Sequence, residues 1–102
     1  MKCNLYNMKL TGKILLNAFK NDHPDSKSSI ESWEAEIEDA NWQNPHDLKS
    51  RYPKASIIGN QRVVFDLCGN RYRLLTIISY KNQMAMVEKI GTYKEYDKWK
   101  LN

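Results

Sequence analysis

The sequence predicts a small α+β domain, with N-terminal helices packed on an antiparallel β-meander that a short C-terminal helix follows. Apolar residues recur at helical spacing in the first half of the chain, whereas short strand-like runs separated by turn residues dominate from residue 57 onward. The chain has 102 residues, about the length of one domain, so residues 1–102 are expected to form a single unit.

A first amphipathic helix is predicted over residues 9–22. Apolar side chains recur there at helical spacing, and the pair His23-Pro24 directly after it disfavours further helix. The apolar stripe of this helix consists of Ile14, Leu15, Ala18 and Phe19.

A second helix is predicted to follow, with Asp25, Ser26 and Ser28 as alternative N-caps. Ser28 and Glu31 have the spacing of a capping box. The acidic outer face of this helix is either solvated or complements the basic second half of the chain. The apolar stripe consists of Ile30, Trp33, Ile37 and Ala40, and the acidic face of Glu31, Glu34, Glu36, Glu38 and Asp39.

A short third helix is predicted from Pro45 to about Arg51, because Asn44 is a favourable N-cap and proline is favoured at the first helical position. The pair Tyr52-Pro53 ends it. The helix and the loop after it bring three cations into one neighbourhood, Lys49, Arg51 and Lys54.

Three strands are predicted next, at Arg62–Leu67, Tyr72–Tyr80 and Met84–Ile90. The turns between them are short, so the strands must be antiparallel neighbours. Side chains alternate along the central strand, which places Arg73 on the face opposite to that of Tyr72.

A final helical turn is predicted after the last strand. Thr92 and Glu95 have the spacing of a capping box. Tyr93 and Tyr96 lie three residues apart within this turn, so their side chains point in the same direction.

Charge is unevenly divided along the chain. Residues 1–48 hold five basic and eight acidic groups, a net charge of −3, whereas residues 49–102 hold eleven basic and four acidic groups, a net charge of +7. A basic half speeds the encounter with a polyanion, so nucleic acid is the first partner to consider. The alternative is a solvated, lysine-coated surface without a nucleic-acid partner.

The sequence contains no pattern that predicts a metal, another cofactor or a membrane partner. Its two cysteines and two histidines are not at metal-ligand spacing. No apolar run approaches the roughly 20 residues that cross a bilayer, and the first residues lack the apolar core of a signal peptide. A cytoplasmic location is therefore expected.

Five motifs follow one another along the chain: His23-Pro24-Asp25, Trp42-Gln-Asn-Pro, Gly59-Asn-Gln-Arg-Val-Val-Phe, Gly69-Asn-Arg-Tyr-Arg-Leu and Gly91-Thr-Tyr-Lys-Glu-Tyr-Asp-Lys-Trp. Each is weak alone, but their order and spacing together resemble the HigB-type toxins of bacterial type II toxin–antitoxin systems. These toxins are RelE-like messenger-RNA endonucleases, so a RelE-like fold is implied. The resemblance begins at about Met8, which leaves residues 1–7 as an N-terminal extension with Met8 as an alternative start.

The resemblance implies metal-independent cleavage of messenger RNA on the translating ribosome, by attack of a ribose 2′-hydroxyl on the adjacent phosphate. This reaction needs a base, an acid and a cation that stabilises the phosphorane. Arg73 is the candidate cation, because a guanidinium stays protonated and forks onto phosphate oxygens. An ion pair with a carboxylate such as Glu88 is the alternative. Tyr96 is the candidate acid or base, with a stacking platform or a packed core aromatic as alternatives.

Two positions depart from the family pattern. Tyr93 stands where the family usually has histidine, and Asp66 where it usually has asparagine. Tyr93 is expected to stack on RNA or to donate a proton in place of the histidine, which completes a catalytic set with Arg73 and Tyr96. Asp66 is either catalytic or a structural replacement.

Contacts to the RNA backbone are assigned to six cations and should weaken steeply with salt. The residues are Lys49, Arg51, Lys54, Arg62, Arg71 and Lys94. For each single lysine, a solvated side chain is the alternative.

The family also implies partners other than messenger RNA and the ribosome. A helix-turn-helix antitoxin, HigA-like, is expected to neutralise the toxin, and operator DNA is expected to be bound indirectly through that antitoxin. Two alternatives to an active toxin remain, a catalytically weakened toxin and a non-catalytic module that binds RNA or a partner.

Overall fold

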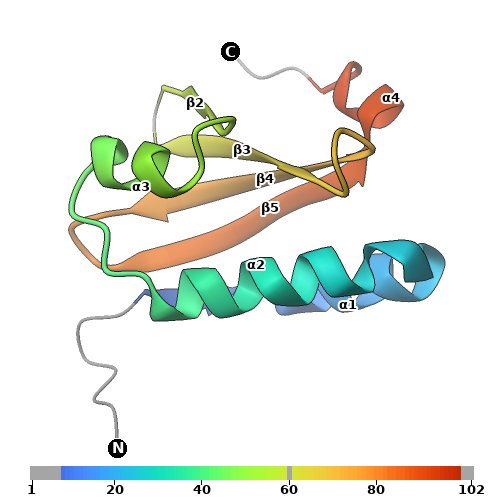
Figure 1. The fold of residues 1–102 in the computed structure, drawn as a ribbon, viewed down its shortest axis with the longest axis horizontal. Coiled ribbons are helices and arrows are strands. Elements are labelled where there is room, and N and C mark those ends of the chain that lie inside the picture. Colours follow the sequence, from blue (N-terminus) through green and yellow to red (C-terminus); the bar gives the residue numbers. More distant parts are fainter. Residues whose placement is uncertain (1–7, 60, 100–102) are drawn as a thin grey trace, which may run out of the picture.

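The computed structural model describes residues 8–59 and 61–99, which form an α+β fold as predicted (Figure 1). The extension proposed for residues 1–7 lies outside the described residues. The elements follow the order β1 (Lys9–Thr11), α1 (Lys13–Asp22), a 3₁₀ turn η1 (Pro24–Ser26), α2 (Lys27–Asp39), α3 (Pro45–Arg51), β2 (Ser56–Ile58), β3 (Arg62–Leu67), β4 (Tyr72–Ser79), β5 (Met84–Thr92) and α4 (Tyr93–Tyr96).

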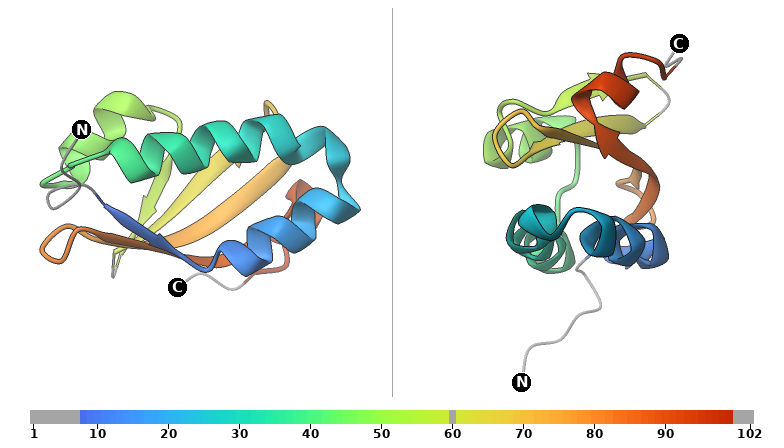
Figure 2. Two further views of the ribbon diagram at one scale, coloured as in Figure 1. Left: turned by 90° about the horizontal axis from the view of Figure 1, so that it is seen from below. Right: turned by 90° about the vertical axis from the view of Figure 1, so that its right-hand side faces the viewer.

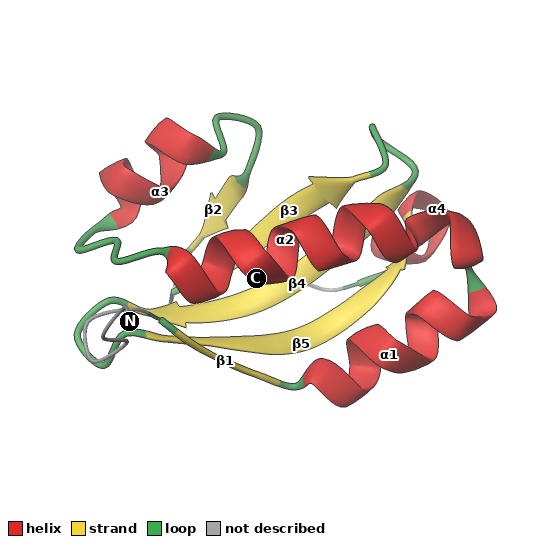
Figure 3. Cartoon of the chain, turned by 60° about the horizontal axis from the view of Figure 1, so that its bottom comes forward, coloured by secondary structure: helices red, strands yellow, loops and turns green. Residues whose placement is uncertain are grey.

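The sheet has five strands in the order β1-β5-β4-β3-β2. The antiparallel meander of β3, β4 and β5 is confirmed, but two short edge strands extend it, and β1 pairs with β5 in parallel. Figure 2 shows α1 and α2 side by side across one face of the sheet, and Figure 3 shows α3 beside the β2 edge. The short helix α4 lies on the other side of the sheet from α1 and α2 (Figure 1).

The prediction that the first helix begins at residue 9 is wrong. Lys9–Thr11 is strand β1, in which Leu10 lies opposite Ala85 of β5. Gly12 then adopts a left-handed conformation with φ of 84°, which a helix cannot continue through, so α1 begins at Lys13.

The apolar stripe predicted for this helix is also largely wrong. Leu16 and Phe19 are the buried residues of α1, whereas Ile14 is 78% exposed and Leu15 is 40% exposed. The turn at Gly12 sets the rotation of the helix about its axis. Neither that turn nor the short strand β1 produces a periodic pattern in the sequence, so the buried face could not be predicted.

The second helix has the predicted core face, and its N-cap is one of the three predicted alternatives. Ile30, Trp33 and Ile37 are fully or almost fully buried. The helix begins at Lys27, so the capping box predicted for Ser28 does not form, because Ser28 already lies inside the helix. The N-cap residue is Ser26, whose hydroxyl donates to the His23 carbonyl at 2.6 Å.

The remaining boundaries follow the sequence closely. Asn44 caps α3 by accepting a hydrogen bond from the Asp47 amide at 3.0 Å, and β3 has the predicted bounds. The strand β5 runs to Thr92, two residues beyond the prediction, and β2 was not predicted as a strand. Within residues 8–59 and 61–99, no helix has the length and apolar character that crossing a bilayer requires.

The main core lies between the sheet and the two long helices. A second, smaller apolar cluster lies on the opposite face, where Val64 of β3 and Leu75 of β4 are buried directly opposite each other. These residues are followed in register by Asp66 and Arg73. The face that carries no long helix thus has a buried apolar centre with charged groups beside it.

Candidate active site

Arg73 lies near the start of β4, directly opposite Asp66 of β3. Its neighbours Tyr72 and Leu74 belong to the main core, so alternation along the strand turns Arg73 to the face away from α1 and α2. Figure 1 shows that α4 lies on this same side. The predicted orientation of Arg73 is therefore confirmed.

The Arg73 side chain is only 18% exposed and is held by several groups. Its Nε lies 3.3 Å from Oδ1 of Asp66, and its Nη1 donates to the Asn70 carbonyl at 2.8 Å. Its guanidinium carbon lies 5.5 Å from the centre of the Tyr96 ring, at a cation–π distance. The alternative partner Glu88 instead pairs with Arg62 at 3.1 Å.

The helix α4 holds Tyr96 in that position. The capping box predicted at its start is present, because the Glu95 amide donates to the Thr92 hydroxyl and the Thr92 amide to the Glu95 carboxylate. The Tyr96 ring packs edge-on against Trp99 at 5.6 Å. One side of the phenol ring thus rests on Trp99 and the ring also contacts Arg73.

Tyr93 occupies a different environment. Its amide donates to the Arg71 carbonyl at 3.1 Å, which ties α4 to the turn before β4. Its side chain is 49% exposed, and within the described part of the chain it has no ring or hydrogen-bond contact with Arg73 or Tyr96. The structure therefore brings two of the three predicted catalytic residues together and leaves Tyr93 beside them in solvent.

Asp66 is the charged group that sequence reasoning left undecided. Its carboxylate is 24% exposed and lies against Arg73 in the middle of the candidate site. Pairing across the β3–β4 hairpin places it there, and the short turn between the two strands would have predicted that register. The site is thus a cluster of a guanidinium, a phenol and a carboxylate.

Most of the six cations predicted to contact RNA have partners within the protein. Arg51 forms a two-pronged pair with Glu36, with one N–O distance of 3.0 Å, and Arg71 forms an ion pair with Asp25. Both carboxylates raise the pKa of their arginine by hydrogen bonding and by charge.

The lysines among these cations behave differently from one another. Lys49 donates to the carbonyls of Pro53 and Ala55, at 2.7 and 2.8 Å, so it fastens the loop after α3. Lys54 and Lys94 are exposed, and neither has an ion pair with another described residue.

The motif at residues 23–25 connects η1 to β4. The Tyr72 hydroxyl donates to both Asp25 carboxylate oxygens, at 2.8 and 2.9 Å. This hydrogen bond and the Arg71 charge lower the pKa of Asp25, while the same hydrogen bond raises the pKa of Tyr72. The His23 ring also stacks on the Phe19 ring of α1, with 4.2 Å between the ring centres.

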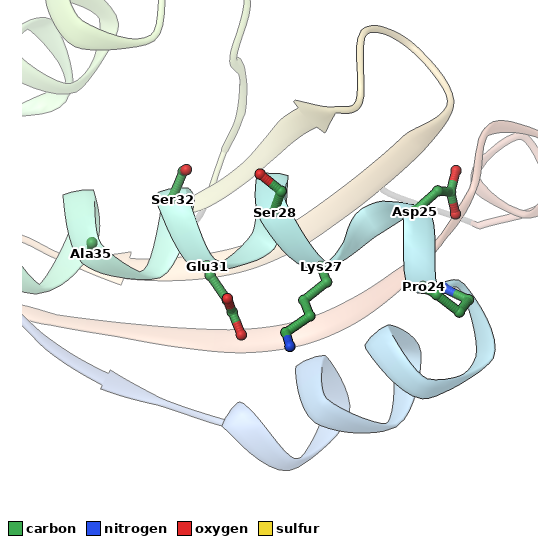
Figure 4. Close-up of a pocket in the computed structure, with 7 residues that line it drawn as sticks. All are labelled: Pro24, Asp25, Lys27, Ser28, Glu31, Ser32 and Ala35. Carbon is green, nitrogen blue, oxygen red and sulfur yellow. The ribbon is translucent and has the colours of Figure 1, made fainter.

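A surface hollow of about 630 Å³ lies along the outer side of α2 and away from Arg73. Figure 4 shows that its lining residues diverge: Lys27 and Glu31 extend towards α1, whereas Ser28 and Ser32 point the other way. Side chains that diverge do not form a binding site. Among residues 8–59 and 61–99, no group of three His, Cys, Asp or Glu side chains is placed to hold a metal ion.

The fold and this cluster define a small α+β protein with a cationic and phenolic site on the sheet face that no long helix covers. The model of the HigB toxin family, described as the RelE-like toxic component of a toxin–antitoxin system, matches residues 26–99. The chain belongs to this family.

Three named relatives match over most of the chain. They are the mRNA interferase toxin HigB of Escherichia coli K12 and the mRNA interferases HigB of Escherichia coli O157:H7 and Shigella flexneri. Each is 24% identical over 90 residues, which covers 86% of this chain and 86% of the relative.

Proposed function

We propose that this chain is a toxin that cuts messenger RNA on the translating ribosome, without a metal, by attack of a ribose 2′-hydroxyl on the neighbouring phosphate. The observation that carries the proposal is the cluster on the sheet face that no long helix covers, where the Arg73 guanidinium lies beside the Asp66 carboxylate and the Tyr96 ring. These groups match the cation, base and acid that this reaction needs. The relatives named mRNA interferases support RNA as the substrate.

In the proposed reaction, Arg73 binds the scissile phosphate and stabilises the charge that develops on it. The 2′-oxygen bonds to phosphorus as its proton passes to Asp66, and the bond from phosphorus to the 5′-oxygen breaks. The Tyr96 hydroxyl protonates the departing 5′-oxygen. The products are a 2′,3′-cyclic phosphate and a 5′-hydroxyl, and return of the proton from Asp66 to the phenolate restores the site.

Tyr93 is assigned to stacking on an RNA base, because its exposed ring lies on α4 beside the cluster. The exposed Lys54 and Lys94 are assigned to the RNA backbone, together with Arg62 and Arg71 once their ion pairs open. Lys49 and Arg51 of α3 are also assigned to the RNA backbone, and Arg51 lines the same cavity as Asp66.

The test is growth and messenger-RNA integrity after induced expression of the wild-type chain and of Arg73→Ala. Loss of the guanidinium should abolish growth arrest and ribosome-dependent cleavage while the protein remains folded. Lys81→Ala, in the turn between β4 and β5, is the matched control and should remain toxic. A fully active Arg73→Ala would remove Arg73 from the site.

A weakened toxin is a second candidate, favoured by the ion pair that occupies Arg73 and by tyrosine at position 93. In that case the wild-type chain leaves growth intact, and Tyr93→His makes it toxic. If neither version harms cells or cuts RNA on ribosomes, the chain is a non-catalytic binding module.

The partners are proposed by family. A HigA-like helix-turn-helix antitoxin would neutralise the toxin and would carry it to operator DNA, and the basic second half of the chain suits an acidic antitoxin segment. Co-expression with a candidate antitoxin should restore growth. Action on ribosomes would place the protein in the cytoplasm, and residues 1–102 would act as one domain.

A further inference from the structure

The main chain of Asp66 faces the outer edge of the sheet. The Ile78 amide donates to the Gln61 carbonyl at 2.8 Å, which makes these opposed residues a hydrogen-bonded pair. Pairing alternates along an antiparallel ladder, so Phe65 and Leu67 bond to β4, whereas the amide and carbonyl of Asp66 point the other way.

No strand covers that edge at Asp66. The pairing of β2 with β3 ends where Ser56 meets Val64. Within the described residues, the Asp66 amide and carbonyl have no hydrogen-bond partner. One residue thus presents a donor and an acceptor side by side at a free edge.

A cavity of about 300 Å³ lies against this edge. Its walls are largely apolar, and the Tyr52 ring is held between Phe65, at 5.1 Å, and the Arg51 guanidinium, at 5.0 Å. Lys49 fixes the opposite wall through its bonds to the loop carbonyls. The walls comprise Tyr52, Pro53, Ala55 and Phe65, and the cations at the cavity are Arg51 and Lys54.

We propose that this cavity binds one RNA base next to the cleaved linkage. Each base has an edge with an adjacent donor and acceptor, which matches the Asp66 amide and carbonyl. The apolar walls suit the flat ring, and the cations suit the adjoining phosphate. The Asp66 side chain reaches Arg73 from the same residue, so the inference rests on RNA lying across the proposed active site.

A peptide strand is the other ligand that a free sheet edge attracts, and the geometry disfavours it. Strand addition uses main-chain groups of several alternate residues. The edge here is open at Asp66 alone, between the end of β2 pairing and the turn that follows Leu67. A single donor–acceptor pair beside a largely apolar cavity fits a base better than a strand.

The experiment is an NMR titration of the full chain with adenosine, guanosine, cytidine and uridine, and separately with inorganic phosphate. At least one nucleoside should shift the Ala55 methyl and the Asp66 amide, whereas phosphate alone should leave the Ala55 methyl unchanged. Ala55→Leu, which fills the cavity, should weaken nucleoside binding roughly tenfold or more through lost stacking.

Two variants at position 66 isolate the main-chain contact. Asp66→Pro and Asp66→Ala both lack the carboxylate, but only proline also lacks the amide hydrogen, and proline is tolerated at a sheet edge. Asp66→Pro should bind the nucleoside about 2- to 10-fold more weakly than Asp66→Ala. Equal binding by the two would overturn the proposed contact. This comparison remains decisive if Ala55→Leu fails to fold.

None of these measurements requires RNA cleavage. A chain that cuts RNA while no nucleoside shifts the Ala55 methyl would overturn the base site and leave the proposed function standing. A chain that binds a nucleoside in the cavity but cuts no RNA would support the base site and contradict the proposed function.

Discussion

Arg73 is positioned before any ligand arrives. The Asp66 carboxylate, the Asn70 carbonyl and the Tyr96 ring each fix a different part of its side chain. An arginine that is already ordered loses little side-chain entropy when it binds phosphate. In the proposed reaction, phosphate would compete with Asp66 for the same guanidinium, so phosphate binding at Arg73 and release of Asp66 as the proposed proton acceptor would be coupled.

The two tyrosines of α4 should differ in what their hydroxyls contribute. Tyr96→Phe keeps the ring on Trp99 and Arg73, so the fold should be unchanged, but loss of the proposed acid should slow cleavage by about 10²- to 10⁴-fold. Tyr93→Phe, the matched control, keeps a stacking ring and should cut at nearly the wild-type rate. Single-turnover cleavage on programmed ribosomes measures both. Equal rates for Tyr96→Phe and the wild type would make Tyr96 a packing residue.

At the scale of elements, α4 depends on its cap, because four residues are too few for a stable helix without one. Thr92→Ala removes the hydroxyl that accepts from the Glu95 amide, which should cost about 1 kcal/mol of local stability. Because α4 lies at the periphery, the cleavage rate should fall while the midpoint of unfolding in urea changes little. Thr92→Ser retains the hydroxyl and should restore cleavage, whereas a loss common to both variants would show that the cap is not the cause.

The tie between η1 and β4 should make stability depend on pH. Because its partners lower the pKa of Asp25, this group stabilises the fold above its unfolded pKa of about 4 and loses that contribution as pH falls through the lower, folded value. Asp25→Asn should therefore lower the thermal midpoint at pH 7 and show a smaller further loss at pH 3 than the wild type.

Tyr72 makes stability depend on pH in the alkaline range. Its pKa is raised, so its contribution is fully present below the unfolded pKa of about 10 and is lost as pH rises through the higher, folded value. For the Asp25→Asn experiment, the control is Asp22→Asn, which removes an exposed carboxylate from the neighbouring helix α1. Parallel melting curves against pH for Asp25→Asn and the wild type would contradict the role of this tie.

Elements with local signals were predictable, and those fixed by distant contacts were not. Asn44 before Pro45 and the Thr92–Glu95 spacing each fix a helix start through neighbouring groups. Strand β1 has three residues and exists because β5 pairs with it. The ring contact of Arg73 with Tyr96 likewise needed the packing of α4, although alternation alone gave the face of Arg73.

At the scale of the whole molecule, the acidic first half and the basic second half partly neutralise each other. Ion pairs of Glu36 with Arg51 and of Asp25 with Arg71 join the halves. Glu34 and Glu38 of α2 instead pair with Lys20 and Lys13 of α1, which belong to the first half. Of these three carboxylates of the acidic face, Glu36 therefore complements the basic second half, whereas Glu34 and Glu38 do not. The eleven basic groups of the second half therefore overstate the number of cations that are free to meet RNA, because its four arginines are paired with carboxylates.

This neutralisation predicts the salt dependence of RNA binding. Each phosphate contact on single-stranded nucleic acid contributes about −0.7 to the slope of log affinity against log salt. If only Arg73, Lys54 and Lys94 engage phosphate, the slope should be about −2, whereas engagement of Arg73 with all six predicted cations would give about −5. Fluorescence anisotropy with a 2′-O-methyl RNA, which cannot be cleaved by 2′-hydroxyl attack, measures the slope.

Charge-neutral substitutions of the acidic partners then identify which ion pairs matter. Glu88→Gln releases Arg62 on the candidate RNA face and should steepen the slope by about 0.7. Glu38→Gln releases Lys13 of α1. The helices α1 and α2 cover the other face of the sheet, so this substitution should leave the slope unchanged. A wild-type slope near −5 would mean that the internal ion pairs open when RNA binds, since RNA would then have replaced the carboxylates as the partner of these cations.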